Sequence, residues 1–409
     1  MKRLTLAVIA VLFAAAVLCR TAPRDAPTAD ATPKRIVAYF AEWGVYGRKY
    51  NVMDVPADKL THINYAFAQI DADGEIAVID ARAALEKVYP GDSREAGALH
   101  GNFHQLQLLK KDHPQLKTLI SVGGWSKSGR FSDAALTDDS RSKFARSCVD
   151  FIGKYGFDGV DIDWEFPVAG GAEGDTARPE DKENFTLLLA ELRKQLDERG
   201  KTDGAHYLLT FAAPAGPGNY KHIELAKVAK LVDWINLMTY DFAGSWSPVT
   251  NFNAPLYGAS NDPGGEAARK RLNVDAAVKA YRDAGVPDDK IVVGVPFYGC
   301  GWTGVKDVND GLFQPHSKER PKGGAFEYRD LAADYVGKYD RHWNDEAKVP
   351  WLFDPKAGVM ISYDDPESIR LKAEYVKKAN LGGVMCWELS GDDGKASLLT
   401  AIHDVLATP

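Results

Sequence analysis

The segment Phe157-Asp-Gly-Val-Asp-Ile-Asp-Trp-Glu165 is the clearest signal in the sequence for the architecture and for the functional site. Side chains alternate between the two faces of a β-strand, so Asp161, Asp163 and Glu165 share one face and the residues between them take the other. The pattern predicts a barrel strand whose inner face carries three carboxylates. By the same parity, Trp164 points away from the acids and is expected to pack against neighbouring elements.

Short runs rich in Val, Ile and aromatic residues alternate with amphipathic helical patterns on both sides of this stretch, from Arg35 onward. Eight such repeats predict an α/β fold, a closed parallel (β/α)8 TIM barrel. The expected strands are Ile36–Trp43, His62–Phe67, Thr118–Val122, Gly159–Trp164, Tyr207–Phe211, Trp234–Met238, Ile291–Phe297 and Gly383–Leu389.

One connection is too long for a barrel loop. The segment that follows the seventh strand contains short aromatic-rich runs, Gly and Pro, and a helix with Asp365 as N-cap and Pro366 in its first turn begins only after it. We therefore expect a small α+β insertion, residues 300–356, between strand seven and helix seven, with the catalytic barrel formed by 35–299 and 357–409. The insertion would lie over the C-terminal mouth of the barrel.

The N-terminus has the pattern of an export signal. Lys2 and Arg3 precede a mostly apolar run, Leu4–Leu18, that is too short to cross a membrane comfortably. We expect a cleaved signal peptide at 1–22, a disordered spacer at 23–34, no membrane span, and a secreted protein. A lipid anchor on Cys19 is the alternative, although Leu18 is a poor match for the residue that precedes such an anchor.

The composition excludes several classes of protein. The 409 residues contain 50 Lys and Arg against 57 Asp and Glu, a net charge of −7, with no basic block of the kind that binds nucleic acid. Four cysteines are too few for a disulfide-stapled scaffold. The nine histidines include no metal-binding HExxH pattern, so we expect no metal and no cofactor. We expect the protein to be a monomer.

The three inward carboxylates indicate acid–base chemistry. Like charges in a medium of low polarity raise the pKa of at least one member of such a group. Glu165 is the outermost acid, so a substrate could reach it, and a carboxyl kept protonated near neutral pH is a general acid. A cluster of charges at a loop end or a metal site are the alternatives, and the metal site lacks a supporting histidine.

Five motifs together resemble family 18 glycoside hydrolases, the chitinases, over nearly the whole chain from Arg35. The octapeptide Asp158–Glu165 is similar to the signature of that family. The other matches, in order, are Ser121-Val-Gly-Gly-Trp125, Met238-Thr-Tyr-Asp241, Tyr363-Asp-Asp365 and Gly382-Gly-Val-Met-Cys-Trp-Glu-Leu-Ser-Gly391. The insertion resembles that of the bacterial, processive-type subfamily.

The resemblance implies a role for each polar residue of the site. Glu165 would protonate the glycosidic oxygen and later act as general base, while the N-acetyl carbonyl of the sugar attacks the anomeric carbon, giving an oxazolinium intermediate and retained configuration. Asp163 would orient the acetamido N–H, and Asp161 would tune the protonation of Asp163. Tyr240 would donate its hydroxyl to the acetamido oxygen. Asp241 and Met238, from the same motif, would bind the sugar.

Aromatic residues at or just beyond the strand ends suit a sugar chain, because pyranose rings pack their C–H faces on aromatic rings. Family motifs support Trp387 and Trp125, and for the other candidates core packing competes with sugar binding. These others are Tyr39, Trp43, Phe67 and Tyr298. Two interpretations apply to four more tryptophans, the core of the insertion or distal sugar subsites, and we expect the core. These are Trp246, Trp302, Trp343 and Trp351. Cys300 stands where the family often has an arginine that binds the sugar.

Three functions are compatible with these features. The first is a secreted chitinase, endo- or exo-acting, that cleaves β-1,4-linked N-acetylglucosamine in chitin and N-acetylchitooligosaccharides. The second is an inactive chitin-binding lectin, a class that typically lacks the acid that Glu165 supplies. The third is an endo-β-N-acetylglucosaminidase acting on N-glycans, which the large insertion disfavours.

Overall fold

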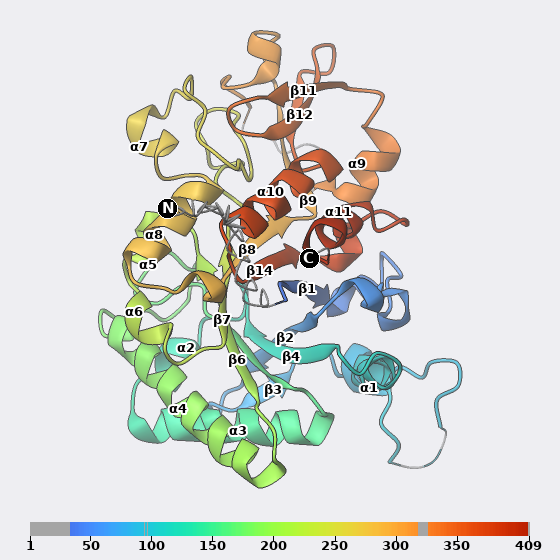
Figure 1. Cartoon of the computed structure of the whole chain (residues 1–409), viewed down its shortest axis with the longest axis vertical. Coiled ribbons are helices and arrows are strands. Elements are labelled where there is room, and N and C mark those ends of the chain that lie inside the picture. Colours follow the sequence, from blue (N-terminus) through green and yellow to red (C-terminus); the bar gives the residue numbers. More distant parts are fainter. Residues whose placement is uncertain (1–32, 94, 96, 318–325, 408–409) are drawn as a thin grey trace, which may run out of the picture. The chain divides into compact units, whose positions relative to one another are not determined.

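The computed structural model describes residues 33–93, 95, 97–317 and 326–407. Within these residues, eight parallel strands form a ring in which β1 pairs with both β2 and β14, so the sheet closes on itself. The (β/α)8 TIM barrel predicted from the sequence is confirmed (Figure 1). Its strands are β1 (Arg35–Ala41), β2 (His62–Ile70), β4 (Lys117–Gly123), β5 (Gly159–Asp163), β6 (Leu208–Pro214), β7 (Trp234–Met238), β8 (Ile291–Pro296) and β14 (Gly383–Trp387).

Local sequence signals explain where the helices begin and end. The α10 helix starts as predicted, with the Asp365 carboxylate accepting the backbone N–H groups of Glu367 and Ser368 at 3.0 Å each. The α3 helix stops at Gly156, whose φ of 76° is left-handed. The helices are α1 (Gly101–Asp112), α2 (Phe131–Ala134), α3 (Asp138–Tyr155), α4 (Asp181–Asp203), α5 (Pro217–Tyr220), α6 (Leu225–Val228), α7 (Gly265–Arg269), α8 (Val274–Asp283), α9 (Tyr328–Asp334), α10 (Pro366–Lys378) and α11 (Ser397–Leu406).

A second, antiparallel sheet follows β8, in the order β10-β9-β13-β12-β11. Its strands run from Tyr298 to Ser362, so it extends beyond the expected limits of 300 and 356 at both ends. At the second limit, the sequence assigned residues 357–409 to the barrel, whereas Val359–Ser362 pairs antiparallel with β9 and β12. The strands are β9 (Tyr298–Thr303), β10 (Phe326–Glu327), β11 (Asp340–Asn344), β12 (Val349–Asp354) and β13 (Val359–Ser362).

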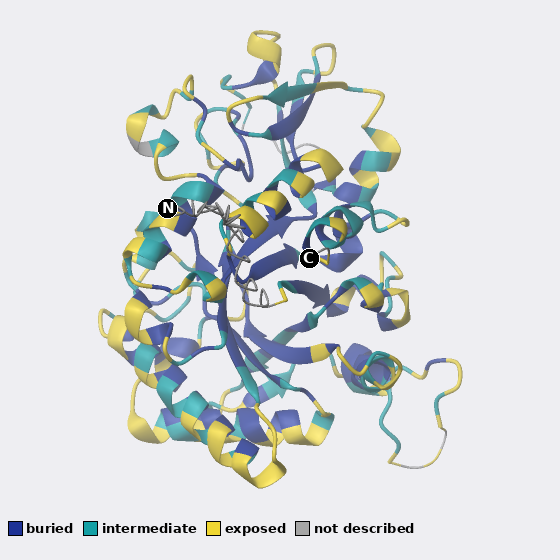
Figure 2. Ribbon diagram, viewed as in Figure 1, coloured by how far each residue is buried: buried dark blue, intermediate teal, exposed yellow. Residues whose placement is uncertain are grey.

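The main hydrophobic core lies between the barrel strands and the surrounding helices, where Figure 2 shows the buried residues concentrated. Trp164 belongs to it, stacking on Phe131 at 5.4 Å and meeting Phe185 edge-on. This confirms the alternation read from the β5 sequence, because Trp164 faces the helices and the acids face the barrel axis. A separate core lies under the second sheet, and Trp302 and Trp351 are buried in it as expected.

The predicted signal peptide and all but the last two residues of the predicted spacer lie outside the described residues. In the described part of the chain, no helix has the length and apolar character needed to cross a membrane. One short strand, β3 (Ile76–Val78), pairs antiparallel with β2 and begins the long excursion toward α1. The 3₁₀ turn η1 (Glu42–Val45) directly follows β1 at the mouth of the barrel.

Candidate active site

Asp161 forms the base of the site, fully buried inside the barrel. Its Oδ2 accepts hydrogen bonds from the Tyr39 and Ser121 hydroxyls, both at 2.7 Å, and its Oδ1 accepts from Thr210 Oγ1 at 2.6 Å and Asn236 Nδ2 at 3.1 Å. These donors come from four different strands. Burial raises the pKa of Asp161, and the four hydrogen bonds oppose that rise by stabilising the ionised form.

Asp163 lies one step further along β5 toward the mouth. It is buried, and its Oδ1 atom has no hydrogen-bond partner among the described residues. Burial, followed by the charges of Glu165 and Asp161, holds the pKa of Asp163 well above its usual range. A buried carboxyl oxygen without a partner is costly, so this one is available to a ligand group that donates a hydrogen bond.

Glu165 follows β5, and its backbone N–H donates to Ser128 Oγ at 2.8 Å. Burial raises the pKa of Glu165 to about 7, with further contributions from the charges of Asp241 and Asp175. The sequence led us to expect Asp161 and Asp163 to supply this effect. That expectation was incomplete, because desolvation is the larger cause and two of the charges involved come from other loops.

The loop after β7 carries a second polar group. The Tyr298 hydroxyl donates to Asp241 Oδ1 at 2.6 Å, while the Asp241 backbone N–H donates to Asn253 Oδ1 at 3.0 Å. Asp241 has a φ of 56°, a left-handed conformation that Asp tolerates better than most residues. The rings of Tyr240 and Tyr298 meet edge-on at 6.2 Å. Burial holds the pKa of Tyr240 well above its usual range, so its hydroxyl stays a hydrogen-bond donor.

Aromatic rings line the opposite wall. Trp387, at the end of β14, stacks on Phe67 with ring centres 5.6 Å apart and contacts Tyr39 at 5.3 Å and Trp43 at 6.2 Å. Gly124 makes room for this packing, because a Cβ there would lie 2.7 Å from the Phe67 ring. Any side chain at Gly124 of the Ser121–Trp125 motif would therefore clash with the Phe67 ring. The four rings come from four elements and form one continuous surface.

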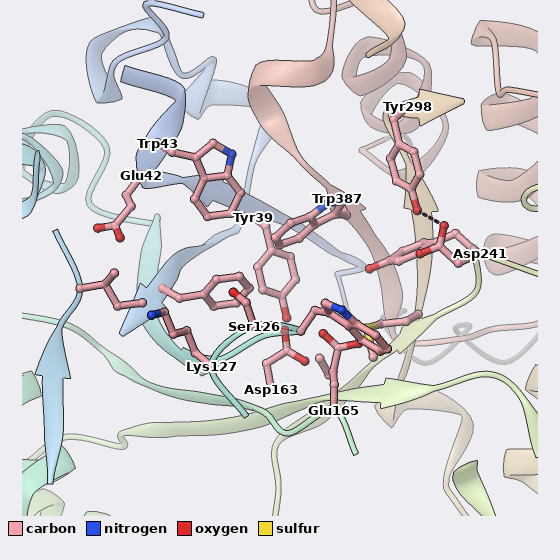
Figure 3. Close-up of a pocket in the computed structure, with 16 residues that line it drawn as sticks. Tyr39, Glu42, Trp43, Ser126, Lys127, Asp163, Glu165, Asp241, Tyr298 and Trp387 are labelled. Atoms are coloured by element: carbon pink, nitrogen blue, oxygen red, sulfur yellow. Dashed lines mark hydrogen bonds between the residues drawn. The ribbon is translucent and has the colours of Figure 1, made fainter. Parts of the chain in front are cut away.

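These groups surround a cavity of about 390 Å³, in which Asp163 and Glu165 face the aromatic wall (Figure 3). A second cavity of about 700 Å³ shares Glu165 and Trp125 with the first and extends past Trp246. Glu165 thus lies between two halves of one cleft. Every predicted site residue except the underlying Asp161 lines the first cavity: Glu165, Asp163, Tyr240, Asp241, Met238, Trp387, Trp125, Tyr298, Tyr39, Phe67 and Trp43.

The expectation that Trp246 belongs to the core is wrong. This side chain is 67% exposed and lines the second half of the cleft. A tight turn explains its position: the Ser247 N–H donates to Gly244 O at 2.9 Å, and the Trp246 ring lies over Gly244, where a Cβ would clash. Cys300 packs against the core of the second sheet. Trp343 is half-buried.

Sequence reasoning missed several polar residues of the site. Thr210 and Asn236 gave no motif signal, but both follow the inward parity of their strands and could have been found from it. Glu42, at the start of η1, and Lys127, on the loop after β4, also line the cleft, and no motif marks either of them. Burial raises the pKa of Glu42 to about 8, while a hydrogen bond from Tyr65 OH at 3.1 Å opposes the rise. Among the described residues, no group of three or more His, Cys, Asp or Glu is arranged to hold a metal ion.

Comparison with known proteins agrees with this geometry. The sequence pattern of the Glycosyl hydrolases family 18 matches residues 35–392. The chain belongs to this family. Among curated family 18 relatives, it is 44% identical to Chitinase A1 of Niallia circulans, over 91% of this chain and 58% of that protein, and 38% identical to Chitinase 1 of Aphanocladium album, over 90% and 85%. This family 18 chain therefore spans a little over half the length of Chitinase A1.

Solved structures lead to the same family. Chitinase ChiA74 from Bacillus thuringiensis superposes with a TM-score of 0.87 at 41% identity, over 92% of this chain and 70% of that one. The barrel and the second sheet of this family 18 hydrolase are therefore shared with a protein of known structure. The inward acids, the aromatic wall and the two-part cleft suit a sugar chain bound beside a carboxyl that can donate a proton.

Proposed function

We propose that this family 18 hydrolase is a chitinase that cleaves β-1,4-linked N-acetylglucosamine chains with retention of configuration. The observation that carries the proposal is the position of Glu165, a carboxyl with a pKa of about 7 between two halves of an aromatic-walled cleft. A cleft that continues on both sides of the acid suits a bond inside a chain. Chitinases among its relatives support the same substrate.

Glu165 acts first as general acid and then as general base. Its proton passes to the glycosidic oxygen as the bond from that oxygen to the anomeric carbon breaks. The resulting carboxylate later takes a proton from the water that attacks the anomeric carbon, which restores the starting form. A pKa of about 7 makes both forms accessible near neutral pH.

The nucleophile is the sugar itself. The carbonyl oxygen of the N-acetyl group bonds to the anomeric carbon and forms a positively charged oxazolinium ring, which water later opens. Asp163 Oδ1, which is buried and has no partner in the part of the chain that the structure describes, accepts the acetamido N–H in this arrangement. The negative charge of the Asp161–Asp163 pair stabilises the ring, and Tyr240 donates its hydroxyl to the acetamido oxygen.

The two halves of the cleft take different parts of the chain. Asp163 handles the sugar whose bond is cut, so the half that contains Asp163 and Trp387 binds the glycon side. The half that contains Trp246 binds the leaving side, and Trp125 faces both. Sugar rings stack on these indoles, and the exposure of Trp125 and Trp246 leaves their faces open to a polymer.

Two measurements test the proposal against its alternatives. A chitinase releases short products from N-acetylchitohexaose, with the β-anomer first in an early NMR spectrum. A lectin binds the hexamer without cleaving it, and an endo-β-N-acetylglucosaminidase releases glycans from a high-mannose glycoprotein. Absence of hexamer cleavage, or an α-anomer as first product, would overturn the proposal.

We also propose that the protein is secreted, on the basis of the charged start and apolar run before residue 22. The proposed activity on a polymeric substrate supports this. Sequencing the N-terminus of the exported protein tests it: a start near residue 23 is expected, and a lipid on Cys19 would favour the anchored form. We expect a monomer, which size-exclusion chromatography with light scattering would check.

A further inference from the structure

We propose that Asp175, in the loop between β5 and α4, is a positioning residue for the general acid: its fixed negative charge biases the proton toward Glu165. This inference rests on the proposed function and adds a residue that takes no part in binding the sugar. Asp175 is half-buried and belongs to none of the motifs that the sequence singles out.

The local sequence builds a rigid seat for this carboxylate. The segment Ala172-Glu-Gly-Asp175 forms a turn in which the Asp175 N–H donates to Ala172 O and the Ala172 N–H donates to Asp175 Oδ2, both at 3.2 Å. Gly174 supplies the left-handed third position, with a φ of 94°. Backbone and side chain of Asp175 are therefore held by the same short turn.

Two glycines then let the carboxylate approach the backbone of Glu165. A Cβ on Gly171 would lie 2.9 Å from Asp175 Oδ2 and 2.6 Å from the backbone oxygen of Glu165. Because both oxygens lie against the same small space, the Asp175 carboxylate is close to the Glu165 backbone. A Cβ on Gly129 would lie 2.8 Å from Asp175 Oδ1. Side chains at either glycine would displace the carboxylate, which is pressed between two loops beside the Glu165 backbone.

The same two loops hold Glu165 itself. The Thr176 N–H donates to Gly129 O at 3.4 Å, tying the Asp175 loop to the loop after β4. Next to Gly129, Ser128 Oγ accepts the Glu165 N–H at 2.8 Å. The loop that carries Asp175 and the backbone of Glu165 are thus both hydrogen-bonded to the segment Ser128–Gly129. This keeps the charge of Asp175 at a fixed place relative to Glu165.

The charges around the acid favour this role. Asp163 on β5 and Asp241 after β7 line the same cavity as Glu165, together with the phenols of Tyr240 and Tyr298, while Asp175 lies behind this lining, beside the Glu165 backbone. Asp175 is among the charges that raise the pKa of Glu165. Besides Glu165 and Asp175, the charged residues on the two packed loops are Glu173, Arg178, Glu180, Lys127 and Arg130, and Arg178 pairs with Asp133 at 2.6 Å.

The test compares pH profiles of kcat/KM on N-acetylchitooligosaccharides for the wild type, Asp175→Asn and Glu173→Gln. The control removes an exposed charge from the same turn, two residues away. We expect the alkaline limb of Asp175→Asn to move down by about half a pH unit, as loss of one nearby charge would do, and that of Glu173→Gln to stay in place. Asp175→Glu, which keeps the charge, should retain the wild-type limb.

Several outcomes would overturn the inference. If Asp175→Asn is active and the alkaline limb of its kcat/KM profile does not move, the charge of Asp175 has no effect on Glu165. If Asp175→Asn and Glu173→Gln shift that limb equally, the cause is the net charge of the protein rather than the position of Asp175. Asp175→Ser is a second neutral variant that keeps an acceptor for Ala172. Failure of both neutral variants to fold would mean that Asp175 serves the loop rather than the acid. An inactive wild type would instead refute the proposed function.

Discussion

Replacing Thr210 by Val removes one of the four hydrogen bonds that Asp161 accepts, with little change in shape. The bond from Thr210 Oγ1 is 2.6 Å long and lies in the fully buried layer below the catalytic pair. A hydrogen bond to a buried charged group contributes about 1.5–3 kcal/mol, because its loss leaves charge without a partner. We therefore expect the free energy of unfolding to fall by about 2 kcal/mol at pH 8.

The loss should depend on pH with a definite sign. The pKa of Asp161 is already raised by burial, and removing a donor raises it further because the ionised form loses a stabilising bond. The variant then loses stability, relative to the wild type, as pH rises through the range in which Asp161 ionises. Below that range Asp161 is protonated in both proteins, and the difference should shrink.

Urea unfolding at pH 4 and pH 8 measures the loss in free energy of unfolding and its dependence on pH. Thr210→Ser is the matched control, since it keeps the hydroxyl and loses only a methyl group. kcat should fall about tenfold in Thr210→Val if the transition state loses about 1.4 kcal/mol through the Asp161–Asp163 pair. Two results would show that Asp161 is not an ionised group stabilised by its hydrogen-bond donors. One is an equal loss in free energy of unfolding at the two pH values for Thr210→Val, and the other is a larger loss in Thr210→Ser than in Thr210→Val.

Three further predictions concern the acid, the aromatic wall and the framework. With a pKa of about 7 for Glu165, kcat/KM should fall about tenfold per pH unit above that value, and a profile flat to pH 9 would contradict the assignment. Trp387→Ala removes the ring that joins three others, so kcat/KM on the hexamer should drop roughly 30-fold, or about 2 kcal/mol, with the unfolding midpoint checked by calorimetry. Lys372→Met leaves Asp364 buried without its cation, which lies 2.6 Å away, and should cost about 3–5 kcal/mol in urea unfolding; a loss below about 1 kcal/mol would show that the pair is not needed.

Strand positions were predictable because the barrel buries both strand faces and makes their composition distinctive. Trp234–Met238 was predicted to the residue, and Gly159–Trp164 overran by one. Boundaries failed where a strand belonged to another sheet: Val359–Ser362 lies in the part of the chain assigned to the barrel, and its antiparallel pairing with β9 places it in the second sheet. Pairing depends on contacts distant in sequence, which local pattern does not contain.

The residues of the site also fall into a group that the sequence predicts and a group that it does not. Residues on strands, such as Asp161 and Asp163, follow from alternation, and Glu165 from its position at the strand end. Residues on loops do not, because a loop side chain is placed by its own turn. Trp246 shows this clearly, since hydrophobicity favoured the core and a turn at Gly244 turns it into the cleft.

The most direct test of the central claim is Glu165→Gln, which keeps the shape of the acid and removes its proton. We predict a fall of at least about 10³-fold in kcat on N-acetylchitohexaose, with the affinity for the hexamer, measured by calorimetry, within a few fold of the wild type. Turnover close to that of the wild type in this variant would contradict the role of Glu165 as proton donor.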